Sequence, residues 1–190
     1  MGSARGTNQY RRKTTPRPPV DRAAQLKLIG ALAANKNPRV TPQELEQLSY
    51  HQQPGPRELA AAHPDAPAPL LRRLARDPAL QVRRAVASNP HTPGSTLGRL
   101  SRDPEQDVRQ RVGGNPSCPS PVQRRIANSP DWEDRAWVAN NKSADPQVLT
   151  EMLRDTDQYV LQLVLDNPRT PTAAVAMLQL VRGRNPAAGS

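Results

Sequence analysis

Three consecutive stretches of 26 residues decide the fold: HPDAPAPLLRRLARDPALQVRRAVAS (63–88), NPHTPGSTLGRLSRDPEQDVRQRVGG (89–114) and NPSCPSPVQRRIANSPDWEDRAWVAN (115–140). The residues that open them, His63, Asn89 and Asn115, are 26 residues apart without any insertion. The same spacing extends to three further marks, Asn37, Asn141 and Asn167. A fixed period of this length predicts a repeat array instead of a single globular core.

The array is expected to span residues 37–182, in units that start at 37, 63, 89, 115, 141 and 167. The first unit is degenerate and the last is truncated. Residues 20–36 are expected to form an N-terminal capping helix with Asp21 as its N-cap. Residues 1–19 are rich in Arg, Pro and Thr and are predicted to be disordered, and residues 183–190 to be a flexible C-terminus.

Each unit carries two signals for the start of a helix. In the unit that starts at 89 they are Thr92-Pro93 and Asp103-Pro104, and Cys118-Pro119 replaces the first signal in the next unit. A Ser, Thr or Asp side chain can cap the amides of the first turn, and proline is tolerated at the first helical position. The abundance of proline, 22 residues, is therefore compatible with a helical chain, because proline marks the expected starts of helices.

Apolar residues recur at helical spacing inside each unit. Leu97 and Leu100 are three apart, Val108 and Val112 are four apart, and equivalent pairs occur in other units. Helices this short are marginal alone and become stable by stacking on neighbouring units. The sequence predicts an all-α solenoid of short paired helices, and the short unit favours a tight, 3₁₀-like conformation for one helix of each pair.

The unit NPxTPxxxLxxLxxDPxxxVRxxVA resembles the leucine-rich repeat variant family of bacterial proteins. The resemblance covers residues 37–181 and is best in 63–140. It implies a right-handed superhelix of alternating α- and 3₁₀-helices, distantly similar to HEAT-type repeats. Some family members carry a cysteine-ligated iron–sulfur cluster near the N-terminus, but this chain has no cysteine before Cys118, so no cluster is expected.

The composition argues against several functional classes. With one cysteine, an intrachain disulfide and an all-cysteine metal site are impossible, and a cytoplasmic location is expected. No apolar run approaches the length of about 20 residues needed for a membrane span. The three histidines show no metal-ligand spacing, and Cys118 is expected to be a simple substitution of a cap residue. No catalytic motif stands out, so we expect no enzymatic activity, no cofactor and no metal.

One set of repeated polar residues has a structural interpretation. The arginines of this set follow the valine column and lie six residues after Asp77, Asp103 and Ser129; they are Arg83, Arg109 and Arg135. Each arginine could pair with a capping carboxylate of its own or the next unit, which we favour over a phosphate-contacting ladder. The structural set also includes the repeated asparagines Asn89, Asn115, Asn141 and Asn167.

A second set of arginines is a candidate for partner binding. One column holds Arg73, Arg99 and Arg125, a second column three residues later holds Arg76, Arg102 and Arg154, and Arg72 and Arg124 flank them. No capping role is expected to require arginine in these columns. Stacked units would align them into a stripe that meets phosphates or a partner's carboxylates. The alternative is an ordinary solvated face.

Two tryptophans and one aspartate make the unit 115–140 unusual. Trp132 is expected to be partly exposed and is a candidate anchor for a partner. Trp137 lies beside the valine column and is expected to be in the core. Asp134 occupies the position of Val82 and Val108, which suggests a register shift or a locally altered site.

The basic character of the chain leaves two functions open. The formal net charge is +10, and half of the excess lies in residues 1–20, in Arg5, Arg11, Arg12, Lys13 and Arg17. The first function is a protein-interaction adaptor that grips an acidic or extended segment. The second is salt-sensitive, largely sequence-nonspecific binding of nucleic acid through the stripe and the basic tail. A GC-rich genome could also produce this composition without an acidic partner.

Overall fold

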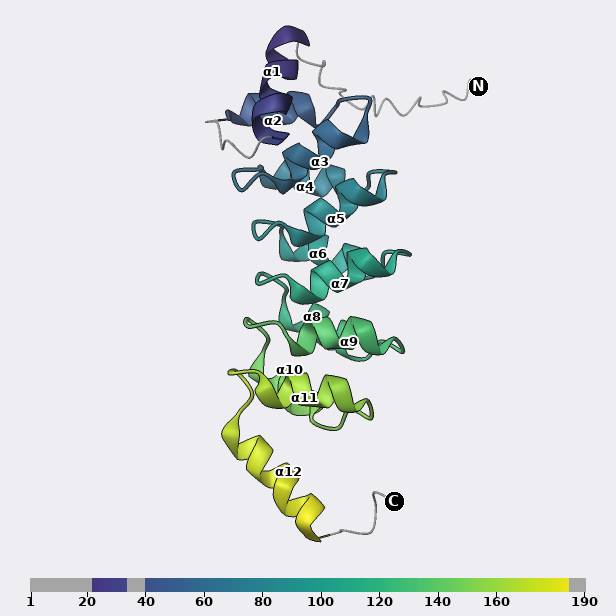
Figure 1. Cartoon of the computed structure of the whole chain (residues 1–190), viewed down its shortest axis with the longest axis vertical. Coiled ribbons are helices and arrows are strands. Elements are labelled where there is room, and N and C mark those ends of the chain that lie inside the picture. Colours follow the sequence, from purple (N-terminus) through teal and green to yellow (C-terminus); the bar gives the residue numbers. More distant parts are fainter. Residues whose placement is uncertain (1–21, 34–39, 185–190) are drawn as a thin grey trace, which may run out of the picture.

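The structure, a computed structural model, describes residues 22–33 and 40–184. Within these ranges the chain forms twelve α-helices and no strand. Helical pairs stack one after another along a single long axis (Figure 1). The α-solenoid predicted from the repeat is therefore present. The tail of residues 1–19, including its five basic residues, and the cap residue Asp21 lie outside the described residues.

Each repeat unit contributes a first and a second helix. The first helices are α2 (Pro42–Leu48), α4 (Ala68–Leu74), α6 (Gly94–Leu100), α8 (Ser120–Ala127), α10 (Pro146–Met152) and α12 (Thr172–Arg184). The second helices are α3 (Pro54–Ala62), α5 (Leu80–Ser88), α7 (Gln106–Gly114), α9 (Trp132–Ala139) and α11 (Gln158–Asp166). Helix α1 (Arg22–Ala33) precedes the array, and α12 extends into the segment 183–190 that was expected to be flexible.

The core is a continuous column of small aliphatic side chains. The second helices α3, α5, α7, α9 and α11 pack against one another in sequence along the array. The predicted stripes face this interior: Leu97, Leu100, Val108 and Val112 are all buried, as are their equivalents in the neighbouring units. Each short helix thus gains its stability from the units on either side of it.

The expected 3₁₀-helices are absent from the described part of the chain. Both helices of each pair are α-helical. Bonds of the tighter i to i+3 type occur in turns and at helix ends, for example where the amides of Arg102 and Asp103 donate to the carbonyls of Arg99 and Leu100. The seven-residue first helices are α-helical, and the turn that follows each of them contains the tighter i to i+3 hydrogen bonds. The right-handedness implied by the resemblance stays a prediction.

The capping prediction holds for two first helices and is wrong for others. Thr41 forms a capping box with Glu44, and Asp145 accepts from the amide of Gln147. Thr92, however, precedes the cap position, which Pro93 occupies, and its hydroxyl donates to the carbonyl of Val86 at 2.6 Å. The preceding helix competes successfully for the threonine hydroxyl.

The second predicted cap is also displaced. Helix α5 begins at Leu80, and its cap position is held by Ala79, so Pro78 lies in the preceding turn and not at the first helical position. Asp77 accepts a hydrogen bond from the amide of Ala79 at 3.0 Å. The aspartate therefore orders the turn that leads into the helix, without capping the helix itself.

A ladder of buried asparagines joins successive units. The Nδ2 of Asn115 donates to the carbonyl of Ala87 at 2.7 Å and to that of Asn89 at 2.9 Å, and its Oδ1 accepts from the amide of Ser117. The same pattern is formed by Asn89, Asn141 and Asn167. Each asparagine thus satisfies the carbonyl of the residue that opens the preceding unit and a carbonyl near the end of the unit before that.

A second ladder pairs arginine with aspartate in the following unit. Arg83 donates from Nε and Nη2 to both carboxylate oxygens of Asp103, at 2.8 and 3.1 Å. Arg57 and Arg135 bind the next unit's aspartates, Asp77 and Asp155, in the same bidentate way. Arg83 and Arg135 therefore hold neighbouring units together, as the sequence predicted for them. Arg57 lies in the degenerate first unit and was not identified from the sequence.

Candidate partner-binding surfaces

The first arginine column of the predicted stripe is engaged within the solenoid. It consists of Arg73, Arg99 and Arg125. Arg99 donates to the carbonyl of Ala75, the residue that ends helix α4, and Arg125 donates to the Oγ of Ser101 at 2.9 Å. The carboxyl end of a helix carries partial negative charge, which favours a cation there. The expectation that no capping role requires arginine in this column is therefore wrong.

The second arginine column remains open. Arg76, Arg102 and Arg154 are exposed and form no ion pair within residues 22–33 and 40–184, and the same holds for Arg72. Arg124 is different, because its Nε pairs with Glu151 at 2.9 Å. The stripe is thus reduced to a few separate guanidinium groups.

An aromatic hollow of about 370 Å³ lies over helices α7, α9 and α11. It is lined by Trp132, Trp137 and Tyr159, with Ala136 and Leu163 beside them and Gln110, Glu133 and Asn140 as polar lining. The ring centroids of Trp132 and Tyr159 are 5.7 Å apart with the planes at 90°. Edge-to-face contact of this kind fixes both rings while leaving their outer surfaces to solvent.

The three aromatic side chains remain substantially exposed. Trp132 is 44% exposed, as expected from the sequence, and Tyr159 is 60% exposed. Trp137 is 37% exposed, so its predicted place in the core is wrong. The buried residues at this end of α9 are the adjacent Val138 and Ala139, which turns Trp137 outward.

A small residue opens the hollow. Ala136 stands where the neighbouring second helices carry Arg84, Gln110 and Gln162, each 26 residues from the next. Replacing a long side chain by alanine leaves room between the flanking tryptophans. This difference between the units is visible in the sequence once the repeats are aligned. The same alignment places Trp137 in the surface column of Arg111 and Leu163.

Trp137 is seated on the preceding unit. A Cβ atom at Gly114 would lie 2.7 Å from the ring carbon Cε3 of Trp137, so only glycine leaves space for the ring in this position. The guanidinium of Arg111 lies over the same ring, 5.4 Å from its centroid. Trp137 is thus positioned by packing against Gly114 and by a cation–π contact with Arg111.

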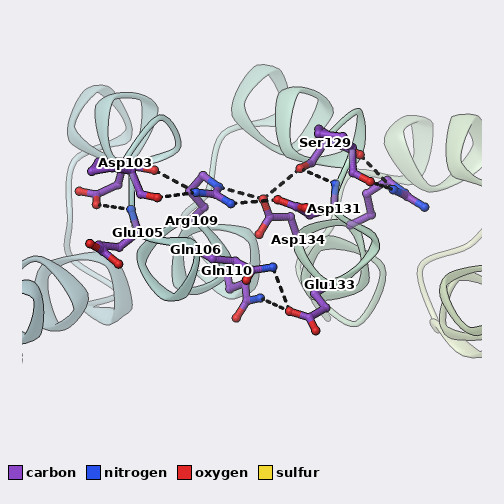
Figure 2. A network of polar contacts seen from close by, with 12 residues as sticks. Asp103, Glu105, Gln106, Arg109, Gln110, Ser129, Asp131, Glu133 and Asp134 are labelled. Atoms are coloured by element: carbon purple, nitrogen blue, oxygen red, sulfur yellow. Dashed lines mark hydrogen bonds and ion pairs between the residues drawn. The ribbon is translucent and has the colours of Figure 1, made fainter.

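A polar network supports the beginning of helix α9 (Figure 2). Asp134 is 1% exposed, and its Oδ2 accepts from Arg109 Nε at 2.9 Å and from Ser129 Oγ at 3.0 Å. Ser129 stands where the other units carry Asp77, Asp103 or Asp155. One carboxylate for Arg109 has therefore moved from position 129 into the valine column, at Asp134, with no shift of register. A second one, Asp131, lies 3.1 Å from the Nη2 of Arg109. The locally altered site suggested by the sequence is the arrangement found.

Figure 2 also shows how the carboxylate of the hollow is held. Glu133 accepts from the side-chain amides of Gln106 at 2.9 Å and Gln110 at 3.3 Å. Both donors are neutral, so the negative charge of Glu133 is oriented without being neutralised. The wall of the hollow therefore combines aromatic surface with one fixed carboxylate.

The remaining candidate for reactive chemistry is inert. Cys118 is buried, and burial raises the pKa of its thiol to about 12. A thiol in this state is not a nucleophile at neutral pH. No group of three or more His, Cys, Asp or Glu suited to a metal occurs in the described ranges.

None of the helices in the described residues is both long and apolar enough to cross a membrane.

One repeat length of the chain is similar to a known family. Residues 80–105, which run from the start of α5 to the turn before α7, match the sequence model of the family described as leucine rich repeat variant. No curated protein and no solved structure matches the chain. The similarity of this one unit to a repeat family, together with the stacked helices, supports a repeat-based binding module.

Proposed function

We propose that this chain is a non-catalytic adaptor that binds an extended, acidic segment of a partner protein, with an apolar side chain of the partner anchored in the aromatic hollow. The observation that carries this proposal is the hollow itself. Aromatic residues make up 3% of the chain, yet three of them surround this one opening. Trp and Tyr are the residues that most often dominate the energy of protein interfaces.

The acidic character of the partner is supported by the exposed arginines. Arg72, Arg76, Arg102 and Arg154 keep their guanidinium groups free of ion pairs within the described residues. Carboxylates of a partner can form bidentate bonds with such groups. An extended segment suits the elongated array, because it can meet several successive units (Figure 1).

Nucleic-acid binding is the alternative. It is supported by the net charge of +10 and by the same exposed arginines. The column of Arg73, Arg99 and Arg125 does not support it, because each of these arginines binds a residue of the preceding unit. It predicts affinity for duplex DNA that falls steeply as salt rises from about 50 to about 200 mM.

The proposal is tested by affinity capture after nuclease treatment, followed by titration of each purified partner against the full chain. Tryptophan fluorescence reports directly on the hollow. We expect Trp132→Ala to weaken binding at least about tenfold, as truncation of an aromatic anchor does. Leu80→Ala is the matched control, since Leu80 is exposed and holds the same repeat position on α5.

Two results would overturn the proposal. One is a partner protein whose affinity is the same for Trp132→Ala, Leu80→Ala and the unaltered chain. The other is binding that disappears with nuclease treatment and reappears with purified duplex DNA, in which case the alternative function holds.

A further inference from the structure

An arginine-lined hollow of about 490 Å³ lies between the units that start at 63 and 89. It is bounded by the ends of the first helices α4 and α6 and by the turns that follow them. Its charged lining consists of Arg76, Arg83, Arg99, Arg102 and a single carboxylate, Asp103. Four arginines against one aspartate leave three positive charges in excess.

Three of the four guanidinium groups keep most of their donors available. Arg83 has four of its five N–H groups engaged, two with Asp103 and two with backbone carbonyls. Arg99 makes one bond, to the carbonyl of Ala75. Arg102 makes only a long contact of 3.4 Å with the carbonyl of Gly98, and Arg76 is bound to none of the described residues. Most of the free N–H groups therefore belong to Arg76, Arg99 and Arg102.

The positive surroundings act on Arg99. Burial lowers the pKa of this guanidinium, the charge of Arg76 lowers it further, Asp103 opposes the change, and Arg83 adds to the lowering. A cation that is disfavoured by its neighbours gains when an anion enters. Two or three guanidinium groups around one opening also match the several acceptor oxygens of an oxyanion.

The equivalent hollow two units further along has no such excess. It lies between the units that start at 115 and 141, with a volume of about 350 Å³. There Asn128 stands in the place of Arg76 and Glu151 in the place of Arg99. Its remaining charges are Arg135, Arg154 and Asp155, so two arginines face two carboxylates. The excess positive charge therefore distinguishes the hollow between units 63 and 89 from the one between units 115 and 141.

We propose that this hollow binds one phosphate dianion, carried by a phosphorylated side chain of a protein partner. A phosphate monoester brings about two negative charges and three acceptor oxygens at neutral pH. Nucleic acid is the less suitable ligand, because its phosphates form a line and the arginine columns are interrupted at Asn128 and Glu151. The site is separate from the aromatic hollow and does not depend on it.

The test is a titration of the full chain with N-acetyl-O-phosphoserine amide, inorganic phosphate and a DNA duplex, at constant ionic strength. NMR signals of the arginine Nε–H groups report on the site. We expect saturable shifts of the Arg76, Arg99 and Arg102 signals with one phosphoserine bound. Arg76→Gln and Arg102→Gln should each weaken binding about tenfold, as loss of one charge-assisted hydrogen bond does.

Matched variants sharpen the test. Arg154→Gln, in the balanced hollow, should leave the affinity unchanged. Combined Asn128→Arg and Glu151→Arg substitutions should add a second phosphoserine site of similar affinity. Trp132→Ala should not alter the titration, so failure of this site is distinguishable from failure of the aromatic hollow.

Several results would overturn the proposal. Shifts that do not saturate, or that persist in Arg76→Gln and Arg102→Gln, would show general screening only. Inorganic phosphate binding more tightly than the phosphoserine derivative would make free phosphate the ligand. A duplex that binds the same three arginines more tightly than the phosphoserine derivative would make it a nucleic-acid site.

Discussion

At the scale of single residues, the unit 115–140 shows how an ion pair can be relocated. Arg109 needs a carboxylate in the following unit, as Arg83 does, but position 129 holds serine. Asp134 supplies that carboxylate from a buried position, and one of its oxygens, Oδ1, has no hydrogen-bond partner among the described residues. The two exchanges, Asp to Ser at 129 and Val to Asp at 134, are thus coupled.

This coupling predicts a double-mutant cycle. Asp134→Val alone should lower the free energy of unfolding by about 1–3 kcal/mol, because it leaves Arg109 short of its buried partner. Ser129→Asp with Asp134→Val restores the arrangement of Asp103 and Val108, and should be at least as stable as the unaltered chain. Urea unfolding of the two single variants and the double variant measures the coupling.

One result of the double-mutant cycle would contradict the coupling. If the effects of the two substitutions simply add, Ser129 and Asp134 do not share the task of binding Arg109. The matched pair is Arg83 with Asp103, where Asp103→Ser should destabilise the chain because Val108 stands in the place of Asp134 and supplies no carboxylate.

At the scale of helices and units, the repeated columns were predictable from the sequence, whereas the partners of the repeated polar residues were not. Leu97, Val108 and Asn115 recur at fixed spacing, and buried side chains in a periodic array must recur in this way. The column of Arg99 also recurs, but its partner is a backbone carbonyl of the preceding unit. A carbonyl is present at every position, so the sequence contains no mark of that bond.

Two other residues show why local patterns misled the prediction. Thr92 precedes a proline as helix caps often do, yet its hydroxyl has a choice of acceptors and binds the carbonyl of Val86. Trp137 is large and apolar and adjoins the buried column, but on a helix the adjacent position points elsewhere. Aligning Trp137 with Arg111 and Leu163 would have placed it on the surface.

The asparagine ladder predicts the cost of breaking one junction. Asn141→Ala removes two donated hydrogen bonds, to Gly113 and Asn115, and one accepted from Ser143. At about 1 kcal/mol for each bond, the free energy of unfolding should fall by about 3 kcal/mol. Urea unfolding measures the change, and Asn140→Ala, at the exposed neighbouring residue, is the control.

For this junction, equal stability of Asn141→Ala and Asn140→Ala would mean that water replaces the lost side chain without cost. Asn141→Asp distinguishes loss of side-chain volume from loss of hydrogen bonds, because it keeps the size of the side chain and the acceptor but removes the donor. We expect it to be at least as destabilising as Asn141→Ala, since it places a carboxylate against two carbonyl oxygens.

At the scale of the whole molecule, the buried aspartates of the arginine ladder link folding to pH. Burial raises the pKa of Asp77, but the hydrogen bond from Arg57, the amide of Ala79 and the nearby arginine charges bring it below its ordinary value of 3.8. Burial also raises the pKa of Asp155, but hydrogen bonds from Arg135 and the amide of Asp157 bring that pKa below its ordinary value. Groups of this kind stabilise the fold fully above their unfolded pKa, and that stability is lost as the pH falls through the folded pKa.

We therefore expect stability to decline as the pH falls below about 4, the ordinary range of an aspartate. Thermal unfolding followed by circular dichroism between neutral and strongly acidic pH measures this dependence. Asp77→Asn should be less stable at neutral pH and should show a shallower acid dependence. Asp65→Asn is the matched control, because Asp65 is 80% exposed and pairs with no arginine. An unchanged acid slope in Asp77→Asn would contradict the assignment.

The asparagine ladder also gives the array a direction. Every rung donates from a later unit to carbonyls of the two units before it, for example from Asn167 to Ala139 and Asn141. During synthesis the earlier unit leaves the ribosome first, and its carbonyls can remain hydrated until the next asparagine arrives. Growth from the amino terminus thus never leaves a rung's amide waiting for its acceptors, whereas removing the leading units would strand one. The arginine ladder has the opposite direction, because Arg83 donates to Asp103 of the following unit, so loss of units from either end leaves one kind of donor unpaired.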